Sequence, residues 1–454
     1  MTASAPPRTV PLPRLWGTRS RDIGALLVGN GVLILAMWIR HGGLEQLSTP
    51  SDVLSGAGQI AALFGTYLAL IQLVLMSRSP WLDEAFGMDR LAWWHRWLGF
   101  GTVWMIGGHL VLTLAGWALG DERSLADELL VLLGTYPYVL WGLIGFVVFV
   151  AIGLISLRAV RHRLPYELWF WLHMGTYVAI ALAFLHQLFT GSDFVHDEMA
   201  TLYWIVLYDI AIALILVFRL GLPIVASRRH QLRVAAVVPE GPGVVSIYLT
   251  GRELDMLAVR SGQYFVFRFM TRQWWWRGHP FSISSAPNGS WLRITVKARG
   301  DDTHKLQTIP VGTGVFIEGP YGVMTGARRT KRKVTLIAGG VGIAPLRALL
   351  ESTAAAPGEL VLLYRAGRKE DLVFKDELDL LAKQRKAVVR YLVGHRKRMQ
   401  HDPLGPASIG RLVPDIAEHD VYVCGPNGMM DTVDHSLWTL GVPRSQIHAE
   451  RFSY

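Results

Sequence analysis

The sequence contains a single cysteine, Cys424, in 454 residues. One cysteine cannot form a disulfide within the chain, and it cannot supply the several thiolates that a structural zinc site or an iron–sulfur cluster needs. Acidic residues are also fewer than basic ones, which gives a formal net charge of +10. A redox centre in this protein must therefore use other ligands, and the meaning of the basic excess depends on where it lies.

Several other motifs are missing, and each absence makes one class of function less plausible. The glycine-rich segment 339–342 lacks the Gly-Lys-Ser/Thr ending of a phosphate-binding loop, so nucleotide hydrolysis is disfavoured. No calcium-binding loop of the EF-hand type is present. The basic run 328–333 has no interleaved aromatic residues, so we expect a solvated linker with some attraction to anionic lipid and no nucleic-acid partner.

Long apolar runs fill the first half of the chain, up to about residue 225. Each is long enough to cross the hydrocarbon core as a helix of about 20 residues. The first run is expected to be a retained helix and not a signal peptide, because no small-residue cleavage site follows it. The predicted spans are 22–40, 57–76, 96–117, 134–157, 166–190 and 201–220.

Basic residues in the short loops predict the orientation of these spans, because cytoplasmic loops retain Lys and Arg. The N-terminal tail and every second loop are basic, whereas the other loops are acidic, with Arg40 and Arg123 as exceptions. We therefore expect a protein integral to the cell membrane, with both termini in the cytoplasm. The residues that carry the pattern are Arg14, Arg19, Arg78, Arg90, Arg158, Arg161, Arg163, Arg219, Arg228 and Arg229.

Four histidines lie on the third and fifth predicted helices, His95 directly before the span 96–117 and the other three within their spans, where ionisable residues are costly and rare. His95 and His109 are 14 residues apart, and His173 and His186 are 13 apart, so the members of each pair lie about 20 Å apart along a helix. The two spans run in the same direction. His95 can therefore face His173, and His109 can face His186.

Each facing pair suits a b-type haem with two imidazole ligands and no open position at the iron. A spacing of 14 residues leaves about 40° of misalignment on a straight helix, whereas 13 residues leave about 140°. We therefore expect a bend or bulge near Gly175. Hydrogen bonding between helices explains a lone histidine well, but it explains four at matched depths poorly.

The second half of the chain shows two successive patterns. Six short strand-like segments between 231 and 318, bounded by Gly and Pro, predict a small antiparallel β-barrel. From about residue 332, strands alternate with helices, at 333–338, 359–364, 387–393 and 420–424, which predicts a parallel α/β sheet of nucleotide-binding type.

Three motifs in this half, together with the histidine pairs, resemble the ferric reductase and NADPH oxidase family, whose cytoplasmic module is built on the ferredoxin reductase fold. They are 277–285 (RGHPFSISS), 339–345 (GGVGIAP) and 424–426 (CGP). The resemblance implies four parts: a cytoplasmic tail (1–20), a six-helix transmembrane haem domain (21–222), an FAD-binding barrel (228–326) and an NAD(P)H-binding α/β domain (332–454).

The flavin is expected to contact the 277–285 motif. Ser282 can donate to or accept from the edge of the flavin ring, and Arg277 and His279 can meet its pyrophosphate, with Pro280 and Phe281 between them. Thr303 opens a helical stretch and offers a second phosphate contact, although an ordinary helix cap explains it equally well.

The nicotinamide nucleotide is expected at the two glycine-containing motifs. Bare backbone at Gly339, Gly340 and Gly342 can approach a pyrophosphate. The resemblance places Cys424, Gly425 and Pro426 near the nicotinamide. Arg365 and Arg368 favour NADPH over NADH through the 2′-phosphate, with a solvated basic loop as the alternative. Glu450 and Phe452 resemble the family's C-terminal Glu-x-aromatic ending, in which the ring covers the flavin, although Tyr454 is also near.

These expectations combine into one function, the transfer of electrons from cytoplasmic NAD(P)H through FAD and two haems to an outside acceptor, dioxygen or a ferric chelate. Two alternatives remain open. One keeps the haems and passes electrons to a quinone or a partner protein. The other is a transporter or proton channel without haem, in which the histidines relay protons and the cytoplasmic half senses redox state.

Overall fold

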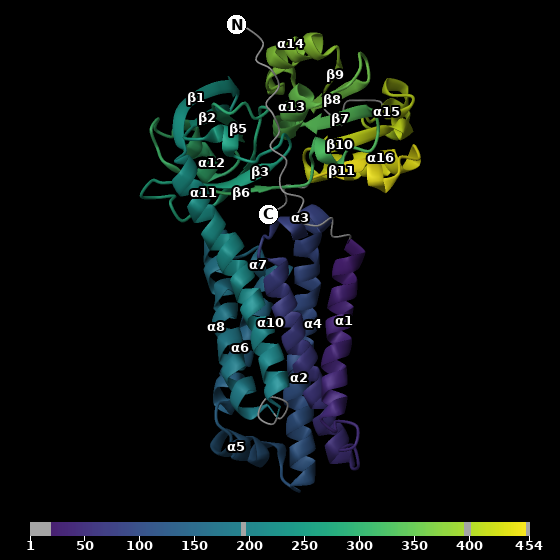
Figure 1. The fold of residues 1–454 in the computed structure, drawn as a ribbon. Coiled ribbons are helices and arrows are strands. Elements are labelled where there is room, and N and C mark those ends of the chain that lie inside the picture. The colour runs from purple at the N-terminus through teal and green to yellow at the C-terminus, as the bar shows by residue number, and fades with distance from the viewer. Residues whose placement is uncertain (1–19, 192–196, 395–400, 451–454) are drawn as a thin grey trace. The chain divides into compact units, whose positions relative to one another are not determined.

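The computed structural model describes residues 20–191, 197–394 and 401–450 (Figure 1). They form two compact units. One contains the helices up to Arg219, and the other contains Leu220 onward together with Gly87–Asp89. Each unit is described by itself below.

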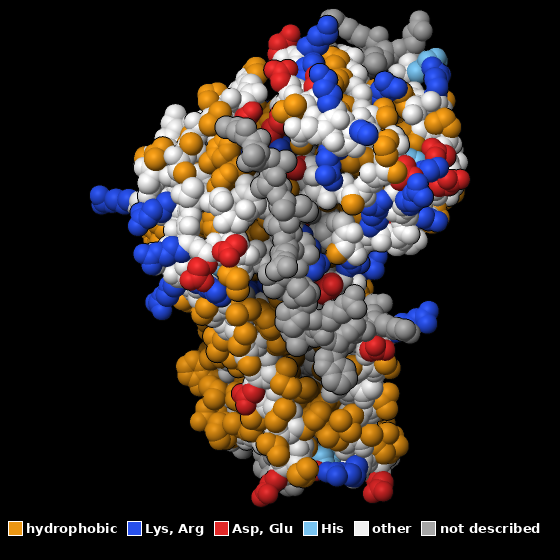
Figure 2. Space-filling view, turned by 45° about the horizontal axis from the view of Figure 1, so that its top comes forward, with side chains coloured by type: hydrophobic (Ala, Val, Ile, Leu, Met, Phe, Trp, Pro, Cys, Tyr) orange, Lys and Arg blue, Asp and Glu red, His pale blue; other side chains and the backbone are white. Residues whose placement is uncertain are grey.

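The first unit is a helical bundle. Among the described residues, six helices are long and apolar enough to cross a membrane, so the chain is an integral membrane protein. Hydrophobic side chains cover the surface of this unit, as contact with lipid requires (Figure 2). The helices that carry these spans are α1 (Ser20–Arg40), α2 (Pro50–Leu75), α4 (Met88–Gly120), α6 (Val139–Ser156), α8 (Tyr166–Thr190) and α10 (Glu198–Ile215).

Local sequence explains where several of these helices begin. Thr49 caps α2 and forms a reciprocal capping box with Asp52. Asp197 caps α10 by accepting from the amides of Met199 and Ala200. Short polar side chains thus satisfy amide groups that would otherwise be unpaired at the helix ends.

Two features of the bundle differ from the prediction. The short helix α5 (Leu125–Thr135), capped by Ser124, fills the loop before the fourth span, which begins at Val139 and not at residue 134. The last helix does not stop near residue 220. It continues through the π-helical turn Leu216–Gly221 into α11 (Leu222–His230), where Gln231 ends it in a left-handed conformation. Two further short helices are α3 (Pro80–Phe86) and α7 (Arg158–Arg161).

The second unit begins with two antiparallel three-stranded sheets, β1-β2-β5 and β4-β3-β6. Two isolated bridges join them, between Arg233 and Gly314 and between Ile283 and Ile294, which closes the six strands into a barrel. The barrel encloses an apolar core that includes Phe265, Phe267 and Phe269. Its strands are β1 (Arg233–Gly241), β2 (Val244–Thr250), β3 (Tyr264–Phe269), β4 (His279–Ser282), β5 (Leu292–Lys297) and β6 (Val315–Tyr321).

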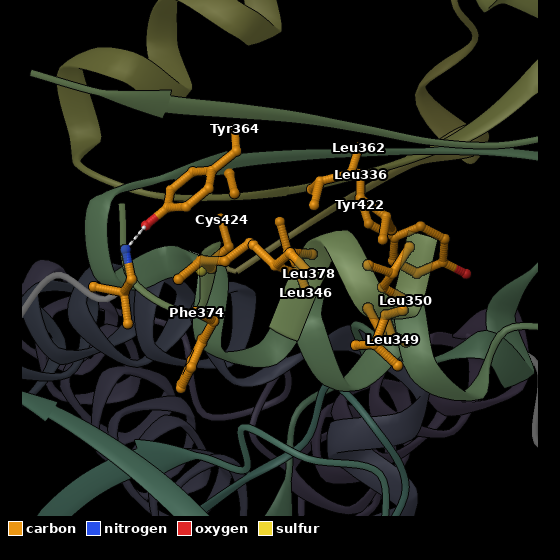
Figure 3. Packing of buried hydrophobic residues seen from close by; sticks show 14 of the residues in the cluster. Leu336, Leu346, Leu349, Leu350, Leu362, Tyr364, Phe374, Leu378, Tyr422 and Cys424 are labelled. Carbon is orange, nitrogen blue, oxygen red and sulfur yellow. Dashed lines mark hydrogen bonds between the residues drawn. The ribbon is translucent and has the colours of Figure 1, made fainter. Parts of the chain in front are cut away.

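A parallel five-stranded sheet of order β11-β10-β7-β8-β9 follows. Its central strands are apolar on both faces, because helices cover both sides. Figure 3 shows one covered face, where Leu336, Leu346 and Tyr364 pack around Cys424. The elements are β7 (Lys333–Gly339), α13 (Ile343–Ser352), β8 (Leu360–Ala366), α14 (Lys375–Arg385), β9 (Val388–Val393), α15 (Pro406–Leu412), β10 (His419–Cys424), α16 (Asn427–Thr439) and β11 (Ile447–Ala449).

The predicted fold class is confirmed: six apolar helices precede an antiparallel barrel and a parallel α/β sheet. The three-residue strand β11 was not predicted, because its pairing with β10 depends on a neighbour far away in the sequence.

Candidate functional site

The four intramembrane histidines form two pairs between α4 and α8. The rings of His95 and His173 have centroids 6.0 Å apart, and those of His109 and His186 have centroids 6.4 Å apart. A metal ion bonded to two imidazole nitrogens at about 2.0 Å each would set the ring centroids roughly 6 Å apart. Both separations therefore fit a metal held between the rings.

Polar groups on the same helix or on a neighbouring one orient two of these rings. Nδ1 of His109 lies 3.1 Å from the Gly58 carbonyl oxygen and 3.2 Å from Oγ1 of Thr113. Nδ1 of His173 lies 3.4 Å from Oγ of Ser156. A hydrogen bond through Nδ1 leaves Nε2 as the nitrogen for a metal, which is the usual arrangement for histidine ligands.

A cavity of about 310 Å³ surrounds the pair of His109 and His186. Its walls are mainly aliphatic and aromatic. Gly142 makes room for one ring, because a Cβ at this position would lie 2.8 Å from Cγ of His186. Gln187 carries the main polar contacts in the wall: it accepts from the Tyr208 hydroxyl at 2.8 Å and donates to Thr66. A flat, largely apolar prosthetic group suits such a cavity.

The predicted bulge near Gly175 is wrong, because α8 is continuously α-helical from Tyr166 to Thr190. Both of its histidines nevertheless meet their partners on α4. The expectation treated the side chains as pointing straight out from the helix. An imidazole reaches several Å from the axis, so two rings about 140° apart can each lean about 70° toward the same neighbouring helix. The two pairs also differ in interplanar angle, 77° and 43°.

Sequence reasoning missed the residues that orient the rings. Gly58 and Ser156 give no signal along the sequence, because they lie on helices that meet the histidines only in the fold, whereas Thr113 follows His109 by one turn of the same helix. The histidines that we expected to be peripheral are His41, His162 and His196. His41 lies 2.5 Å from a carboxylate oxygen of Asp197, His162 is exposed, and His196 lies outside the described residues.

The barrel presents Ser282 at the end of β4, opposite Tyr264 on β3. Its hydroxyl is buried and has no hydrogen-bond partner among the described residues. A buried polar atom without a partner is costly, so a bound ligand is expected to satisfy it. The flavin edge is a suitable partner. Pro280 and Phe281 lie in the same strand and are partly exposed.

Arg277 and Thr303 were each predicted as phosphate contacts, and Arg277 lies against Asp302, the residue before Thr303. Nη1 of Arg277 lies 2.5 Å from a carboxylate oxygen of Asp302. The Thr303 hydroxyl is already used, because it accepts from the amides of Arg299 and Gly300 and donates to the Gly300 carbonyl. These bonds support the helix-cap explanation of Thr303. His279 is buried on β4.

The two nucleotide motifs meet where β7 and β10 end. The strands pair in parallel, with Cys424 beside Ala338. A Cβ at Gly342 would overlap the Cys424 carbonyl oxygen, so only glycine allows this approach. Gly340 adopts φ +54°, which also favours glycine. Gly339, the last residue of β7, also lies close to Gly425, which follows β10, and Pro426 lies beside them. The strand order reverses beside β7, which is where open α/β sheets bind nucleotides.

Cys424 is fully buried, and this burial, with the nearby Glu450 carboxylate, raises the pKa of its thiol well above the ordinary value. Glu450 follows β11 and reaches the barrel: a Cβ at Gly322 would lie 2.7 Å from one of its carboxylate oxygens. Gly322 also adjoins Tyr264, the neighbour of Ser282. The fold thus gathers these predicted residues around one region. Phe452 lies outside the described residues.

Arg365 lies within β8 and Arg368 lies two residues beyond its end, and both side chains already have partners. Arg365 donates to the carbonyl oxygens of Ala366, Leu392 and Gly394. Arg368 pairs with Asp371 at 3.4 Å and keeps 63% of its side chain exposed.

The barrel and the α/β domain also share a buried charge network. Arg293 of β5 is 3% exposed, and it pairs with Glu377 of α14 at 3.1 Å. Arg347 of α13 contacts both Glu377 and Glu351. Arg293 further donates to the Ser284 carbonyl at 2.7 Å, two residues from Ser282. Sequence gave no sign of this network, because its charges come from three separate elements.

Comparison with known proteins assigns a family to each part of the chain. Residues 61–184 match the ferric reductase like transmembrane component, residues 231–325 match an FAD-binding domain, and residues 336–435 match an oxidoreductase NAD-binding domain.

Individual relatives match the chain in part. Ferredoxin–NADP reductase B of Sorangium cellulosum is 31% identical over 38% of this chain and 77% of its own length. The ferredoxin reductase component of 3-ketosteroid-9-alpha-monooxygenase from Rhodococcus rhodochrous is 30% identical over 50% of this chain and 66% of its own length. A Vibrio cholerae flavohemoprotein is 32% identical, with 45% of its length covered.

Among solved structures, the FAD/NAD binding domain of nitric oxide dioxygenase from Vibrio cholerae matches with a TM-score of 0.40 at 24% identity, over 50% of this chain and 99% of that one. The chain thus joins a ferric-reductase-like transmembrane component to FAD-binding and NAD-binding oxidoreductase domains, and it is an NAD(P)H-dependent oxidoreductase of the ferric reductase type.

Proposed function

We propose that the chain carries electrons from cytoplasmic NAD(P)H through FAD and two b-type haems to an acceptor outside the cell, dioxygen or a ferric chelate. The observation that supports this most directly is the pairing of the four histidines at two levels of the bundle, with ring centroids 6.0 and 6.4 Å apart. When bound, flavin converts a two-electron hydride donor into single electrons, and a haem with two imidazole ligands passes single electrons on.

In this proposal, His95 and His173 hold the haem nearer the cytoplasm, and His109 and His186 hold the outer one. The Gly58 carbonyl fixes the tautomer of His109 by accepting from Nδ1. The apolar walls of the cavity exclude water from the outer pair.

On the cytoplasmic side, Ser282 contacts the flavin ring edge, and Arg277, oriented by Asp302, contacts the pyrophosphate together with His279. The backbone of Gly339, Gly340 and Gly342 and of Gly425 and Pro426 holds the nicotinamide nucleotide. The Cys424 thiol, which stays protonated, and Glu450 flank the site of hydride transfer. We assign the stacking ring to Phe452, with Tyr454 as the alternative.

Arg368 is better placed than Arg365 to determine the preference between NADPH and NADH. A 2′-phosphate could recruit the exposed Arg368 by displacing the weak contact with Asp371, whereas Arg365 would have to leave three carbonyl oxygens. We therefore propose NADPH over NADH. The ratio of kcat/KM for the two nucleotides, measured before and after Arg368→Ala, tests this: the variant should lose the preference, and an unchanged ratio contradicts the assignment.

We place both termini in the cytoplasm, with the four-part division at residues 1–20, 21–222, 228–326 and 332–454. The two basic exceptions on the proposed outer side are each paired locally: Arg40 with Asp197, and Arg123 with Asp121 and Glu128.

The test is the visible spectrum and haem content of the purified, full-length protein. We expect the spectrum of haem with two histidine ligands and two haems per chain. His173→Leu and His186→Leu should each reduce the content to one. His162→Leu, at an exposed histidine, is the matched control and should retain both. A protein with no haem at all would favour the transporter alternative.

The acceptor is tested by stopped flow. The enzyme is reduced with NADPH under anaerobic conditions and then mixed with oxygen or with ferric citrate. The acceptor that reoxidises the haem faster than the steady-state turnover is the competent one, and failure of both contradicts the proposal of an outside acceptor.

A further inference from the structure

A groove, distinct from the cavity of the outer histidine pair, lies on the helical unit between α8 and α10. It has a volume of about 470 Å³, and Leu73 of α2 completes its wall. The lining is aliphatic and aromatic, and its polar groups are the hydroxyls of Tyr177 and Tyr208 and the carboxylate of Asp209. The volume is that of a site for a small organic molecule.

Asp209 is unusual because it is a carboxylate at the middle of a membrane span. It lies 11 residues from Glu198 and 10 from Arg219, or about 15 Å from either end of the span. It is exposed on the surface of the helical unit, and none of the described side chains forms a hydrogen bond or ion pair with it. A charged residue at this depth costs about 2.5–3.5 kcal/mol or more, so its presence calls for a partner.

The groove shares its wall with the cavity of the outer histidine pair. Tyr208 and Ile180 line both. Tyr208 donates to Gln187, the residue that follows His186. The α8 residues of the groove, from Tyr177 to Leu185, fall between His173 and His186, so the groove covers the depth between the two histidine pairs.

We infer that this groove binds a lipid-soluble quinone and is a second exit for electrons, with Asp209 at the quinone head. The inference rests on the proposed haem function. One carbonyl oxygen of the ring lies beside the Asp209 carboxyl, and the apolar walls hold the ring and the start of its tail.

The reaction balances with the proposed donor, NADPH. One NADPH supplies two electrons, the quinone ring takes both, and each of its two carbonyl oxygens gains one proton, so that NADPH, one proton and quinone give NADP⁺ and quinol. Asp209 relays one of these protons from water to the ring. A helix of a partner protein is a poorer occupant, because a concave site bordered by aromatic rings and by the redox cavity fits a flat redox-active ring.

Binding is tested first, without turnover. The full-length protein in lipid nanodiscs is illuminated with an azido-quinone, and the labelled peptides are identified by mass spectrometry. We expect label within residues 177–185 or 205–212, competition by decyl-ubiquinone, and at least a fivefold loss of label in Asp209→Leu. Label elsewhere, or equal label in the variant, overturns the inference. A change from oligomer to monomer in Asp209→Leu identifies a partner helix as the occupant and also overturns it.

Electron transfer is tested by anaerobic reoxidation of the reduced haem with decyl-ubiquinone. Asp209→Asn should slow it at least tenfold, and Asp209→Glu should restore it, whereas Glu198→Gln, on the exposed start of the same helix, should match the wild type. An unaffected rate in Asp209→Asn overturns the inference. The haem spectrum separates the two proposals: labelling of the groove in a protein without haem supports the site and refutes the proposed haem function.

Discussion

The buried charge network between the barrel and the α/β domain leads to the first prediction. Glu377 is the shared partner of Arg293 and Arg347, which are 3% and 5% exposed. Burial opposes the charge on Arg293, but Glu377 keeps the pKa of this guanidinium above its ordinary value. Glu377→Gln keeps the shape and removes the charge, so two buried cations lose their common counter-charge.

The expected loss of stability in Glu377→Gln depends on the interactions that the two arginines keep. Breaking a buried ion pair by removing one partner typically costs about 3–5 kcal/mol. The lower end applies here, because Arg347 keeps Glu351, Arg293 keeps the Ser284 carbonyl, and the Glu377 side chain is itself 29% exposed. We therefore expect a loss of about 3 kcal/mol, or roughly 6–12 °C in the melting temperature of the cytoplasmic part.

The assay is thermal release of FAD from the detergent-solubilised protein, followed by flavin fluorescence. Glu370→Gln, an exposed carboxylate in the same domain, is the control and should shift the midpoint by less than 1 °C. Glu377→Gln should also slow flavin reduction by NADPH, because the network sets how the barrel and the α/β domain meet. A midpoint within 2 °C of the wild type would refute the reasoning that these charges depend on one another.

Three further predictions concern the cytoplasmic site. Gly342→Ala should destabilise the nucleotide domain by about 2 kcal/mol or more and weaken NADPH binding, because the new methyl group overlaps the Cys424 carbonyl; Gly428→Ala, where a Cβ meets nothing within 4 Å, is the control, and equal melting temperatures for the two would contradict this. Ser282→Ala should slow flavin reduction in stopped flow by roughly tenfold, the value of one hydrogen bond of about 1.4 kcal/mol, with haem content unchanged. Burial lowers the pKa of His419 below its ordinary 6.5, so the folded state resists protonation. The stability that this provides is complete above pH 6.5 and decreases as the pH falls below it, and His419→Gln should flatten the dependence of the urea midpoint between pH 7.5 and pH 5.

The membrane half was the more predictable part of the fold. Apolar length and charge patterning locate the six spans, because a lipid environment imposes both on each helix separately. The short helix α5 escaped notice because its apolar residues run into the next span. The continuation of the last helix to His230 escaped it as well, because that segment is basic and polar and carries no hydropathy signal.

The site was predictable where a motif is continuous in sequence and unpredictable where the fold brings distant groups together. Cys424 and Gly342 were recognised from their motifs, and the structure adds the reason that they belong together. The partners of Thr303 and Arg365 could not be foreseen, since a hydroxyl or guanidinium that could bind phosphate can equally satisfy nearby backbone. Asp209 was overlooked because one carboxylate hardly changes the mean hydropathy of a span.

The state of Cys424 has a consequence for the durability of the protein. Peroxide and electrophiles react with the thiolate form of cysteine, and only where they can reach it. The sole thiol of this chain is fully buried, and its pKa lies well above the ordinary value. Peroxide therefore meets no reactive sulfhydryl on this protein, and the sulfur side chains that remain for it to oxidise are the thirteen methionines.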